Sequence, residues 1–375
     1  SKLMRRLACK KGDEQALEIF RDEYLVSDAK SRLALSVANA QKRAVSLNTP
    51  DSFSLYVSIP FCPTRCSYCS FVSHSIASAK KLIPDYVRLL CREIEFSARL
   101  ANEAGLRLET VYVGGGTPTS FSAEDLKKIT DTLASSFDMK SAREFTVEAG
   151  RADSITRDKL EVLKKHGVTR ISVNPQTMNQ KTLDLIGRRH TVEQVKEAFA
   201  LAREVGFTNI NMDIILGLPE ETEIEVQHTI DEIVAMQPDS LTVHSLAIKR
   251  ASKLSQWIEE KGISMLNNTE ETMKIAMEGA KQLRMVPYYL YRQKNMSGNF
   301  ENVGYATEGN FGIYNILIME EKQTIVALGA GSITKRVYPD GRIERCDNVK
   351  DVGLYIEKIE EMMERKKKLL SDPLE

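Results

Sequence analysis

The sequence has no long apolar run, no net charge and no apolar leader segment. A membrane-spanning helix needs roughly 20 consecutive apolar residues, and no stretch of this chain approaches that length. The first residues also lack the apolar core of a signal peptide. Lys and Arg together number 52, as do Asp and Glu, so no overall positive charge attracts a nucleic-acid backbone. We therefore expect a cytoplasmic globular protein that spans no membrane and binds no nucleic acid.

Cysteine is scarce, and its distribution argues against a disulfide framework. Three of the six cysteines are dispersed, at Cys9, Cys91 and Cys346, and we expect them to be ordinary free thiols. The other three lie within the stretch Ser58–Phe71, which reads SIPFCPTRCSYCSF. A secreted disulfide scaffold would spread its cysteines along a shorter chain. A compact cluster in an intracellular protein is more typical of metal binding or of reactive thiols.

The glycine fingerprint G-x-G-x-x-G of dinucleotide-binding folds is missing after the first predicted strand. The chain instead alternates short strands rich in Val and Ile with amphipathic helices. The predicted strands cover residues 55–60, 110–116, 143–149, 170–176, 210–219 and 240–246. The predicted helices cover residues 79–102, 123–136, 158–165, 181–186, 192–205 and 223–236.

This alternation predicts an α/β fold with a parallel sheet, whose strands are joined by right-handed crossovers. A doubly wound open sheet and a barrel-like sheet both fit the pattern. We favour a partial (β/α)6 barrel of the TIM type. It is incomplete because a closed barrel has eight units and this chain has six.

Two further segments flank the predicted barrel, which we assign to residues 51–250. Residues 1–50 are predicted to be an N-terminal helical segment, with one or two helices within 13–47. Residues 251–375 are predicted to be a C-terminal α+β appendix packed across one side of the barrel. Its elements are a helix at 269–283, short strands at 288–291, 314–319, 324–328 and 334–338, and a closing helix at 349–370. Because the chain begins with Ser1 and not with Met, we expect a processed product or part of a longer protein.

Polar or glycine residues lie at the end of each predicted strand. The carboxyl ends of parallel strands meet at one face, where ligands bind in such folds. We therefore expect six separate features to line one site. They are the cysteines after the first strand, Gly114–Pro118 after the second, Glu148 and Gln176 ending the third and fourth, Asp213 within the fifth and Ser245–Ala247 ending the sixth.

The spacing C-x3-C-x2-C brings three thiols into one short loop. A structural zinc site needs four ligands, and the nearby candidate is His74, without a partner C-x2-C pair. Three thiolates suit a [4Fe–4S] cluster in which one iron has no protein ligand and can coordinate a small molecule. From the spacing alone, a zinc site and a chance cluster of packed cysteines remain as alternatives.

At this loop the sequence resembles the radical S-adenosylmethionine (SAM) enzymes, whose signature is C-x3-C-x-aromatic-C, here with Tyr68 as the aromatic residue. Within that superfamily it is similar to the oxygen-independent coproporphyrinogen III oxidases, in particular to the HemZ-type coproporphyrinogen dehydrogenases. The resemblance extends over residues 54–335. It is carried by the segments YVSIPFCPTRCSYCSF, YVGGGTPT, FTVEA, ISVNPQT, IGRRHT and MDIILGLPEET.

The resemblance implies which residues hold the cofactors. Cys62, Cys66 and Cys69 would each bind one iron of a [4Fe–4S] cluster, and the amino and carboxylate groups of SAM would bind the fourth iron. One or two SAM molecules would share the pocket. The residues implied in SAM binding are Tyr56, Tyr68, Gly115, Gly116, Thr117, Glu148, Gln176, Arg188, Asp213 and Ala247.

The resemblance also implies the reaction, an oxidoreductase step of haem biosynthesis. The tetrapyrrole coproporphyrinogen III would be decarboxylated to protoporphyrinogen IX without oxygen, and a donor such as flavodoxin or ferredoxin would reduce the cluster. Because this porphyrin precursor carries propionates, the pocket should supply cations. The substrate-binding candidates, near strand ends or in the tail, are Arg151, Lys249, Arg250 and Arg292.

Two departures from the oxidases leave other functions open. Some oxidases carry a further cysteine where this chain has Phe71. The haem chaperones of the same superfamily carry a His-Asn-x-x-Tyr motif, and the corresponding place here begins with Tyr314-Asn315, without the histidine. That difference disfavours a haem-binding chaperone. A radical SAM methyltransferase or a haem-degrading enzyme acting on a tetrapyrrole is a further alternative.

Overall fold

In the computed structural model, the described part of the chain comprises residues 1–69, 74–248, 266–294 and 296–371, with Ser252, Leu254, Gln256 and Gly262. Every helix in this part is too short or too polar to cross a lipid bilayer.

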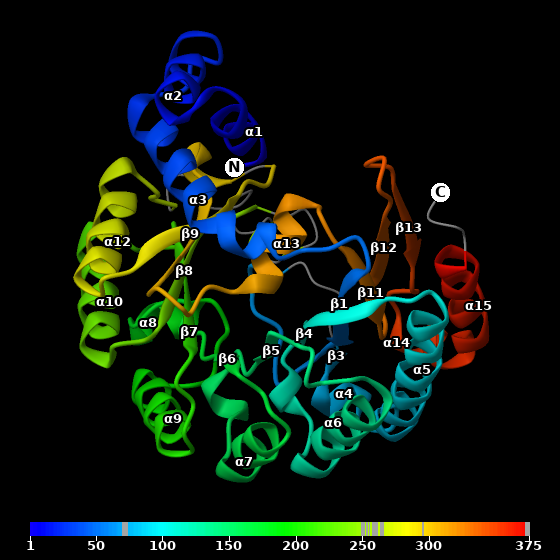
Figure 1. The fold of residues 1–375 in the computed structure, drawn as a ribbon. Coiled ribbons are helices and arrows are strands. Elements are labelled where there is room, and N and C mark those ends of the chain that lie inside the picture. Colours follow the sequence, from blue (N-terminus) through cyan, green and yellow to red (C-terminus); the bar gives the residue numbers. More distant parts are fainter. Residues whose placement is uncertain are drawn as a thin grey trace.

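The centre of the fold is a curved sheet whose six central strands are parallel and follow sequence order (Figure 1). Neighbouring strands pair in parallel from β1 to β8. The predicted α/β class and partial barrel are therefore confirmed. The six strands are β1 Ser52–Ile59, β4 Arg107–Gly115, β5 Glu144–Glu148, β6 Arg170–Ser172, β7 Ile210–Leu216 and β8 Ser240–Ser245.

Helices cover the outer face of this sheet (Figure 1). They are amphipathic: in α5, Leu90 and Ile94 are fully buried one turn apart, whereas Arg88 and Arg92 are exposed. Apart from α8, their apolar faces join the strands in one continuous core. The helices are α5 Ile83–Glu103, α6 Ala123–Ser136, α7 Arg157–Lys165, α8 Gln180–Leu185, α9 Val192–Glu204 and α10 Glu223–Met236. Smaller elements near the cysteines are β2 Phe61–Cys62, β3 His74–Ser75 and α4 Ile76–Ala79.

The C-terminal strands extend both edges of the central sheet, whereas we expected them to pack across one side. β10 pairs antiparallel with β8 and then with β9, while β11 pairs parallel with β1 and then antiparallel with β12, which pairs with β13. An incomplete barrel has two open edges with unpaired backbone groups. Here β11 pairs with the edge strand β1 and β10 pairs with the edge strand β8, so the backbone groups of both edges form hydrogen bonds. The division at residues 50 and 250 remains a prediction. The added elements are α12 Glu270–Gln282, β9 Val286–Tyr291, β10 Asn302–Ala306, β11 Thr324–Leu328, β12 Ile333–Val337 and β13 Ile343–Asp347.

The predicted strand at residues 314–319 is wrong, because this segment is helix α13, Ile313–Glu320. A short apolar run fits a strand or a buried helix equally well from its pattern alone. The tertiary structure selects the helix, since the carboxylate of Glu144 accepts hydrogen bonds from the backbone N–H groups of Ile313 and Tyr314 at its first turn. α13 lies between β9 and β4, on the open side of the sheet.

Two predicted strands are shorter than expected. β6 ends at Ser172, and Gln176 has a φ of 69°, which lies outside the strand region. β7 ends at Leu216, and the next residue, Gly217, has a φ of 81°. β6 therefore ends before Gln176, and β7 ends before Gly217.

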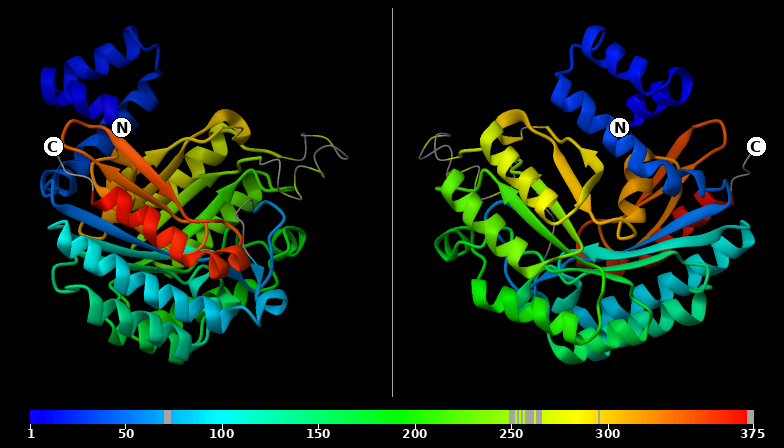
Figure 2. Two further views of the ribbon diagram at one scale, coloured as in Figure 1. Left: turned by 90° about the vertical axis from the view of Figure 1, so that its right-hand side faces the viewer. Right: turned by 60° about the vertical axis from the view of Figure 1, so that its left-hand side comes forward.

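The N-terminal segment has three helices. Two of them lie within residues 13–47, where one or two were predicted, and another precedes them. The first two project from the barrel, whereas the third packs against β9 and α13 (Figure 2). Arg5 forms an ion pair with Glu320 of α13 at 2.8 Å. At the other end of the chain, the predicted single helix is two helices, and the second packs along α5. These elements are α1 Lys2–Lys11, α2 Asp13–Asp22, α3 Asp28–Ser46, α14 Val352–Glu357 and α15 Ile359–Leu370.

Candidate functional site

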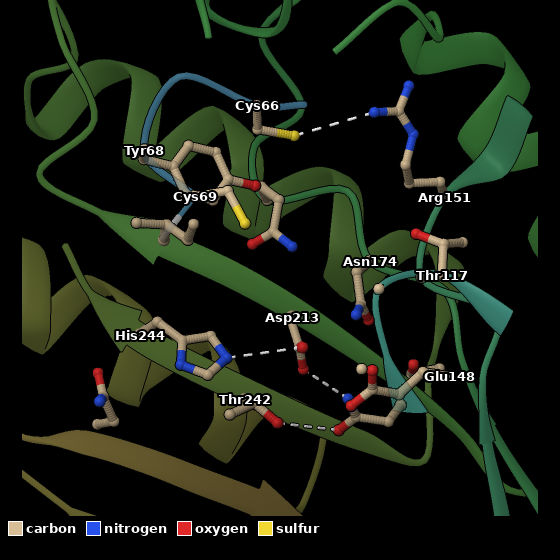
Figure 3. A pocket seen from close by; sticks show the side chains of 18 of the residues that line it. Cys66, Tyr68, Cys69, Thr117, Glu148, Arg151, Asn174, Asp213, Thr242 and His244 are labelled. Atoms are coloured by element: carbon tan, nitrogen blue, oxygen red, sulfur yellow. Dashed lines mark hydrogen bonds and ion pairs between the residues drawn. The ribbon is translucent and has the colours of Figure 1, made fainter. Parts of the chain in front are cut away.

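A cavity of about 430 Å³ lies at the carboxyl ends of the parallel strands (Figure 3). It brings together most of the residues that the sequence assigned to one site, from all six strand ends. Their individual roles stay predictions. The predicted residues that line it are Cys62, Cys66, Tyr68, Cys69, Gly115, Gly116, Thr117, Glu148, Arg151, Gln176, Arg188, Asp213 and Ala247.

Backbone hydrogen bonds hold the cysteine loop against the turn that follows α8. The N–H of Ser67 donates to the carbonyl of Ile186 at 2.9 Å, and the hydroxyl of Thr64 donates to the carbonyl of Gly187 at 3.3 Å. Within the loop, the N–H of Cys69 donates to the carbonyl of Cys66 at 3.2 Å. The loop is therefore anchored on the barrel before any ligand binds.

The glycine turn after β4 packs directly against the chain that enters the cysteine loop. The N–H of Gly116 donates to the carbonyl of Ile59 at 2.8 Å, and that of Thr117 donates to the carbonyl of Phe61 at 2.7 Å. A Cβ on Gly116 would lie 2.5 Å from the Phe61 carbonyl oxygen, and Gly115 has a φ of 109°. The resemblance implied these glycines in SAM binding, but the close approach that requires them here is between two backbone segments.

That packing places the hydroxyl of Thr117 3.5 Å from the sulfur of Cys62. The guanidinium of Arg151 likewise reaches the sulfur of Cys66, at 3.9 Å. Two of the three cysteine sulfurs therefore face a side-chain hydrogen-bond donor. Hydrogen bonds to thiolates are one of the ways in which proteins tune iron–sulfur clusters.

Two carboxylates of the cavity, Glu148 at the end of β5 and Asp213 within β7, have pKa shifts of opposite direction. Burial and the nearby charge of Asp213 raise the pKa of Glu148 to about 7, against the hydrogen bond that Tyr112 donates at 2.5 Å. Burial would also raise the pKa of Asp213, but the hydrogen bond and charge of His244, 3.6 Å away, lower it overall. At neutral pH the site therefore holds one ionised carboxylate and one that readily takes up a proton.

Several buried polar atoms at the cavity have no hydrogen-bond partner among the described residues. Such an atom costs about 1–3 kcal/mol when it stays unpaired, so these positions favour a ligand with many polar groups, as SAM has. From the sequence alone we did not single out Arg170, Ser172 or Asn174. Ser172 and Asn174 could have been found from Gln176, because every second side chain along an extended segment points to the same side. The atoms are Arg170 Nε, Ser172 Oγ, Asn174 Oδ1, Gln176 Oε1 and Arg188 Nε.

The three cysteine thiols are the donor set that a [4Fe–4S] cluster would use. Within the described residues, no three His, Cys, Asp or Glu side chains gather closely enough to hold one ion. In a [4Fe–4S] cluster each thiolate binds a separate iron, so the thiols stand further apart than around zinc. The three cysteines line one cavity, and each could supply a thiolate to a separate iron.

Four predicted site residues lie outside the cavity or outside the described residues. Tyr56 is not among the lining residues and stacks on Tyr112 and Tyr314, with ring centroids 6.1 and 6.2 Å away. Arg292 is exposed outside the cavity and donates to the carbonyl of Asn299 at 2.8 Å. The positions Lys249, Arg250 and Phe71 lie outside the described residues.

Comparisons with known proteins show the family of the chain. The family model of the radical SAM superfamily matches residues 56–233. The chain is 40% identical over 377 residues to the oxygen-independent coproporphyrinogen-III oxidase-like protein HemZ of Bacillus subtilis, covering all of this chain and 75% of that protein. It is 38% identical over 200 residues to the haem chaperone HemW of the same organism, covering 52% of this chain and 51% of HemW.

A solved structure has the same fold. Coproporphyrinogen III oxidase (HemN) from Escherichia coli, described as a radical SAM enzyme, superposes with a TM-score of 0.65 at 22% identity, covering 87% of this chain and 73% of that chain. Enzymes of the radical SAM superfamily use a [4Fe–4S] cluster and SAM. The identity to HemZ over the whole chain decides the family. The chain belongs to the radical SAM superfamily, in the family of oxygen-independent coproporphyrinogen III oxidase-like proteins.

Proposed function

We propose that this protein is a radical SAM oxidoreductase that decarboxylates coproporphyrinogen III to protoporphyrinogen IX. One observation carries the proposal: three cysteines, a glycine–threonine turn and several partnerless polar atoms line a single cavity. The similarity to HemZ and HemN supports the tetrapyrrole as substrate.

The chain's own residues would hold the cofactors in two groups. Cys62, Cys66 and Cys69 would bind three irons, while the strand-end residues Glu148 and Asp213 would hold the polar groups of SAM. When bound, the cluster and SAM supply the means to abstract a hydrogen atom from an unactivated carbon. Transfer of that hydrogen atom from the propionate β-carbon to the adenosyl part of SAM would leave a carbon radical on the substrate. Passing one electron from this radical to an external one-electron acceptor, with loss of CO2, would leave a vinyl group, and the substrate would undergo this twice.

The size and lining of the cavity bear on how a tetrapyrrole would bind. At about 430 Å³ the cavity lies near the lower end of the range of about 300–1,000 Å³ for small-molecule sites. We infer that SAM fills most of it and that one propionate-bearing edge of the macrocycle enters at a time. Tyr289, Tyr291 and Leu246 also line the cavity and would limit the access of water to the reacting carbon.

An anaerobic assay tests the proposal. The reconstituted protein is incubated with SAM, a reductant and coproporphyrinogen III, and the tetrapyrrole is analysed by mass spectrometry. Loss of two CO2 supports decarboxylation, and an added methyl group supports the methyltransferase alternative. If SAM is cleaved while the porphyrinogen returns unchanged, the proposed reaction is wrong.

The cluster has its own test. Wild-type protein should bind about four irons per chain. Cys66→Ala should lose the iron and the visible absorption, whereas Cys91→Ala, on the outer helix α5, should retain both. Iron content that stays near four in Cys66→Ala would contradict the ligand assignment.

A haem chaperone is the second candidate, because HemW is similar over half of this chain. At the place of the chaperone histidine, however, Tyr314 is buried and its ring stacks on Tyr112 at 4.5 Å. A packed tyrosine ring in that position supplies no imidazole ligand to haem. Titration with haem should therefore give no spectrum of a histidine-ligated complex, and appearance of that spectrum would favour the chaperone.

A further inference from the structure

Arg151 lies between the cysteine loop and the end of β5, where only 3% of its surface is exposed. Its Nε and Nη2 atoms both donate to the carboxylate of Asp153, at 2.9 and 2.6 Å. Its Nη1 atom donates to the hydroxyl of Thr64 at 2.8 Å and to the sulfur of Cys66 at 3.9 Å. Figure 3 shows this last contact between Arg151 and Cys66.

A second buried arginine reaches the same loop but is partnered differently. Arg188 donates through Nη1 to the hydroxyl of Tyr68 at 3.1 Å, and through Nη2 to the carbonyls of Gly150 and Asn174 at 3.0 Å. Its Nε atom has no partner among the described residues and lies at the cavity. Arg188 can therefore still bind a ligand, whereas all three nitrogens of Arg151 already have protein partners.

This difference bears on the predicted role of Arg151 as a propionate-binding residue. To bind a propionate, Arg151 would have to leave the bidentate pair with Asp153, which is a strong, well-oriented interaction in a partly buried place. Its Nη1 atom points toward the cysteine loop instead. The contacts of Nη1 with Thr64 and Cys66 suit a side chain that donates a hydrogen bond to the thiolate of Cys66.

We propose that Arg151 is a positioning residue that orients Cys66 and raises the reduction potential of the cluster that Cys66 would help to hold; this rests on the proposed function. A [4Fe–4S] cluster with three thiolates becomes more negative when it takes up one electron from an external donor. A cationic N–H donor at a ligand sulfur stabilises that reduced form. Asp153 fixes the guanidinium and offsets part of its charge.

The arrangement predicts that substitutions of Arg151 and of Asp153 shift the midpoint potential of the cluster in opposite directions. Arg151→Met removes the cation and the donor, so the midpoint potential should become more negative. Asp153→Asn keeps the arginine but removes the opposing charge, so the midpoint potential should become less negative. Arg151→Lys keeps the charge without the planar fork, and its potential should lie between those of Arg151→Met and the wild type.

The experiment compares these variants as full-length protein, reconstituted with iron and sulfide under anaerobic conditions. Iron per chain is measured first, and the midpoint potential follows from a dithionite titration monitored by electron paramagnetic resonance. Arg203→Met is the matched control, because Arg203 also pairs with an aspartate, Asp239 at 2.7 Å, but at the amino ends of the strands. It should leave the potential unchanged.

The outcomes separate the inference from the proposed function. Shifts of opposite sign in Arg151→Met and Asp153→Asn support the inference. Clusters with the wild-type potential in both variants, or shifts of the same sign, overturn it while the cluster assignment stands. A wild-type protein that binds no iron overturns both. If Arg151→Met fails to retain iron, the potentials of Arg151→Lys and Asp153→Asn decide by the same signs.

Discussion

Two glutamates in different regions, Glu93 fully buried and Glu148 half-buried, show how a group that holds the fold differs from one that lines the site. Glu93 on α5 is fully buried, and the protein itself provides donors for both of its carboxylate oxygens. The donors lie 2.6–2.8 Å away, and they are Gly329 N, Asn348 Nδ2, Tyr355 OH and Lys366 Nζ. Through them, α5 is joined to the end of β11 and to the C-terminal helices.

The pKa values of the two glutamates shift in opposite directions. Burial would raise the pKa of Glu93, but the charge of Lys366 and the hydrogen bonds outweigh burial and lower it. For Glu148, burial dominates and raises the pKa to about 7 despite the hydrogen bond from Tyr112. The first carboxylate is fully paired by the fold, and the second is left for a ligand to complete. The following changes test this contrast.

The largest effect is expected at the Glu93 pair. Lys366→Met leaves a buried carboxylate without its cation, which should lower the free energy of unfolding by about 3–5 kcal/mol. Lys367→Met alters an exposed neighbour on α15 and should change it by less than about 0.5 kcal/mol. Urea denaturation of both variants measures the difference. Equal stability of the two variants would show that the pair contributes little.

The second-largest effect is expected in the pH dependence of the free energy of unfolding, to which Glu148 contributes. Because its folded pKa is raised from 4.5 to about 7, ionisation destabilises the fold, and stability is lost as the pH rises between these values. Glu148→Gln removes this loss, so its stability relative to wild type should grow by about 3 kcal/mol between pH 4.5 and 8. Denaturation of both proteins across this range measures it. A constant difference would mean that the folded and unfolded pKa values of Glu148 are the same, and would contradict the raised pKa.

The contribution of Glu93 to stability should depend on pH in the opposite direction to that of Glu148. Its folded pKa is lowered, so its contribution is present above the unfolded value of 4.5 and is lost as the pH falls through the lower, folded value. The stability advantage of wild type over Glu93→Gln should therefore hold at neutral pH and shrink below pH 4.5. An advantage that instead shrank toward alkaline pH would contradict the assignment of Glu93 as an ionised structural group.

The smallest effect is expected at the partnerless amide of Asn174. Asn174→Ala removes an atom that lacks a partner among the described residues, so the free energy of unfolding should change by less than about 1 kcal/mol. The affinity for SAM should fall about tenfold, because one hydrogen bond is lost. Calorimetry with the cluster-loaded protein measures this. Asn209→Ala removes another partnerless amide, away from the cavity, and should leave SAM binding unchanged.

Much of the site could be predicted because it follows the strand periodicity. Once the strands are placed, the carboxyl ends of parallel strands are expected to meet at one face. This predicts that Cys62, Glu148, Gln176 and Asp213 lie together, and all four line the cavity. His244 was missed although it also lies on a strand, because one histidine in an apolar strand gives no motif. Its place beside Asp213 depends on the pairing of β7 with β8.

The sequence by itself determined the parallel α/β core, the cysteine loop and the family, because these depend on local periodicity and on motifs read in order. Only the tertiary structure decided that residues 313–320 form a helix, since the donors of its first turn are satisfied by Glu144 from a distant strand. It likewise decided the partners of Arg151 and Glu93. Hydrogen bonds between segments far apart in the chain depend on how the elements pack, which no local pattern records.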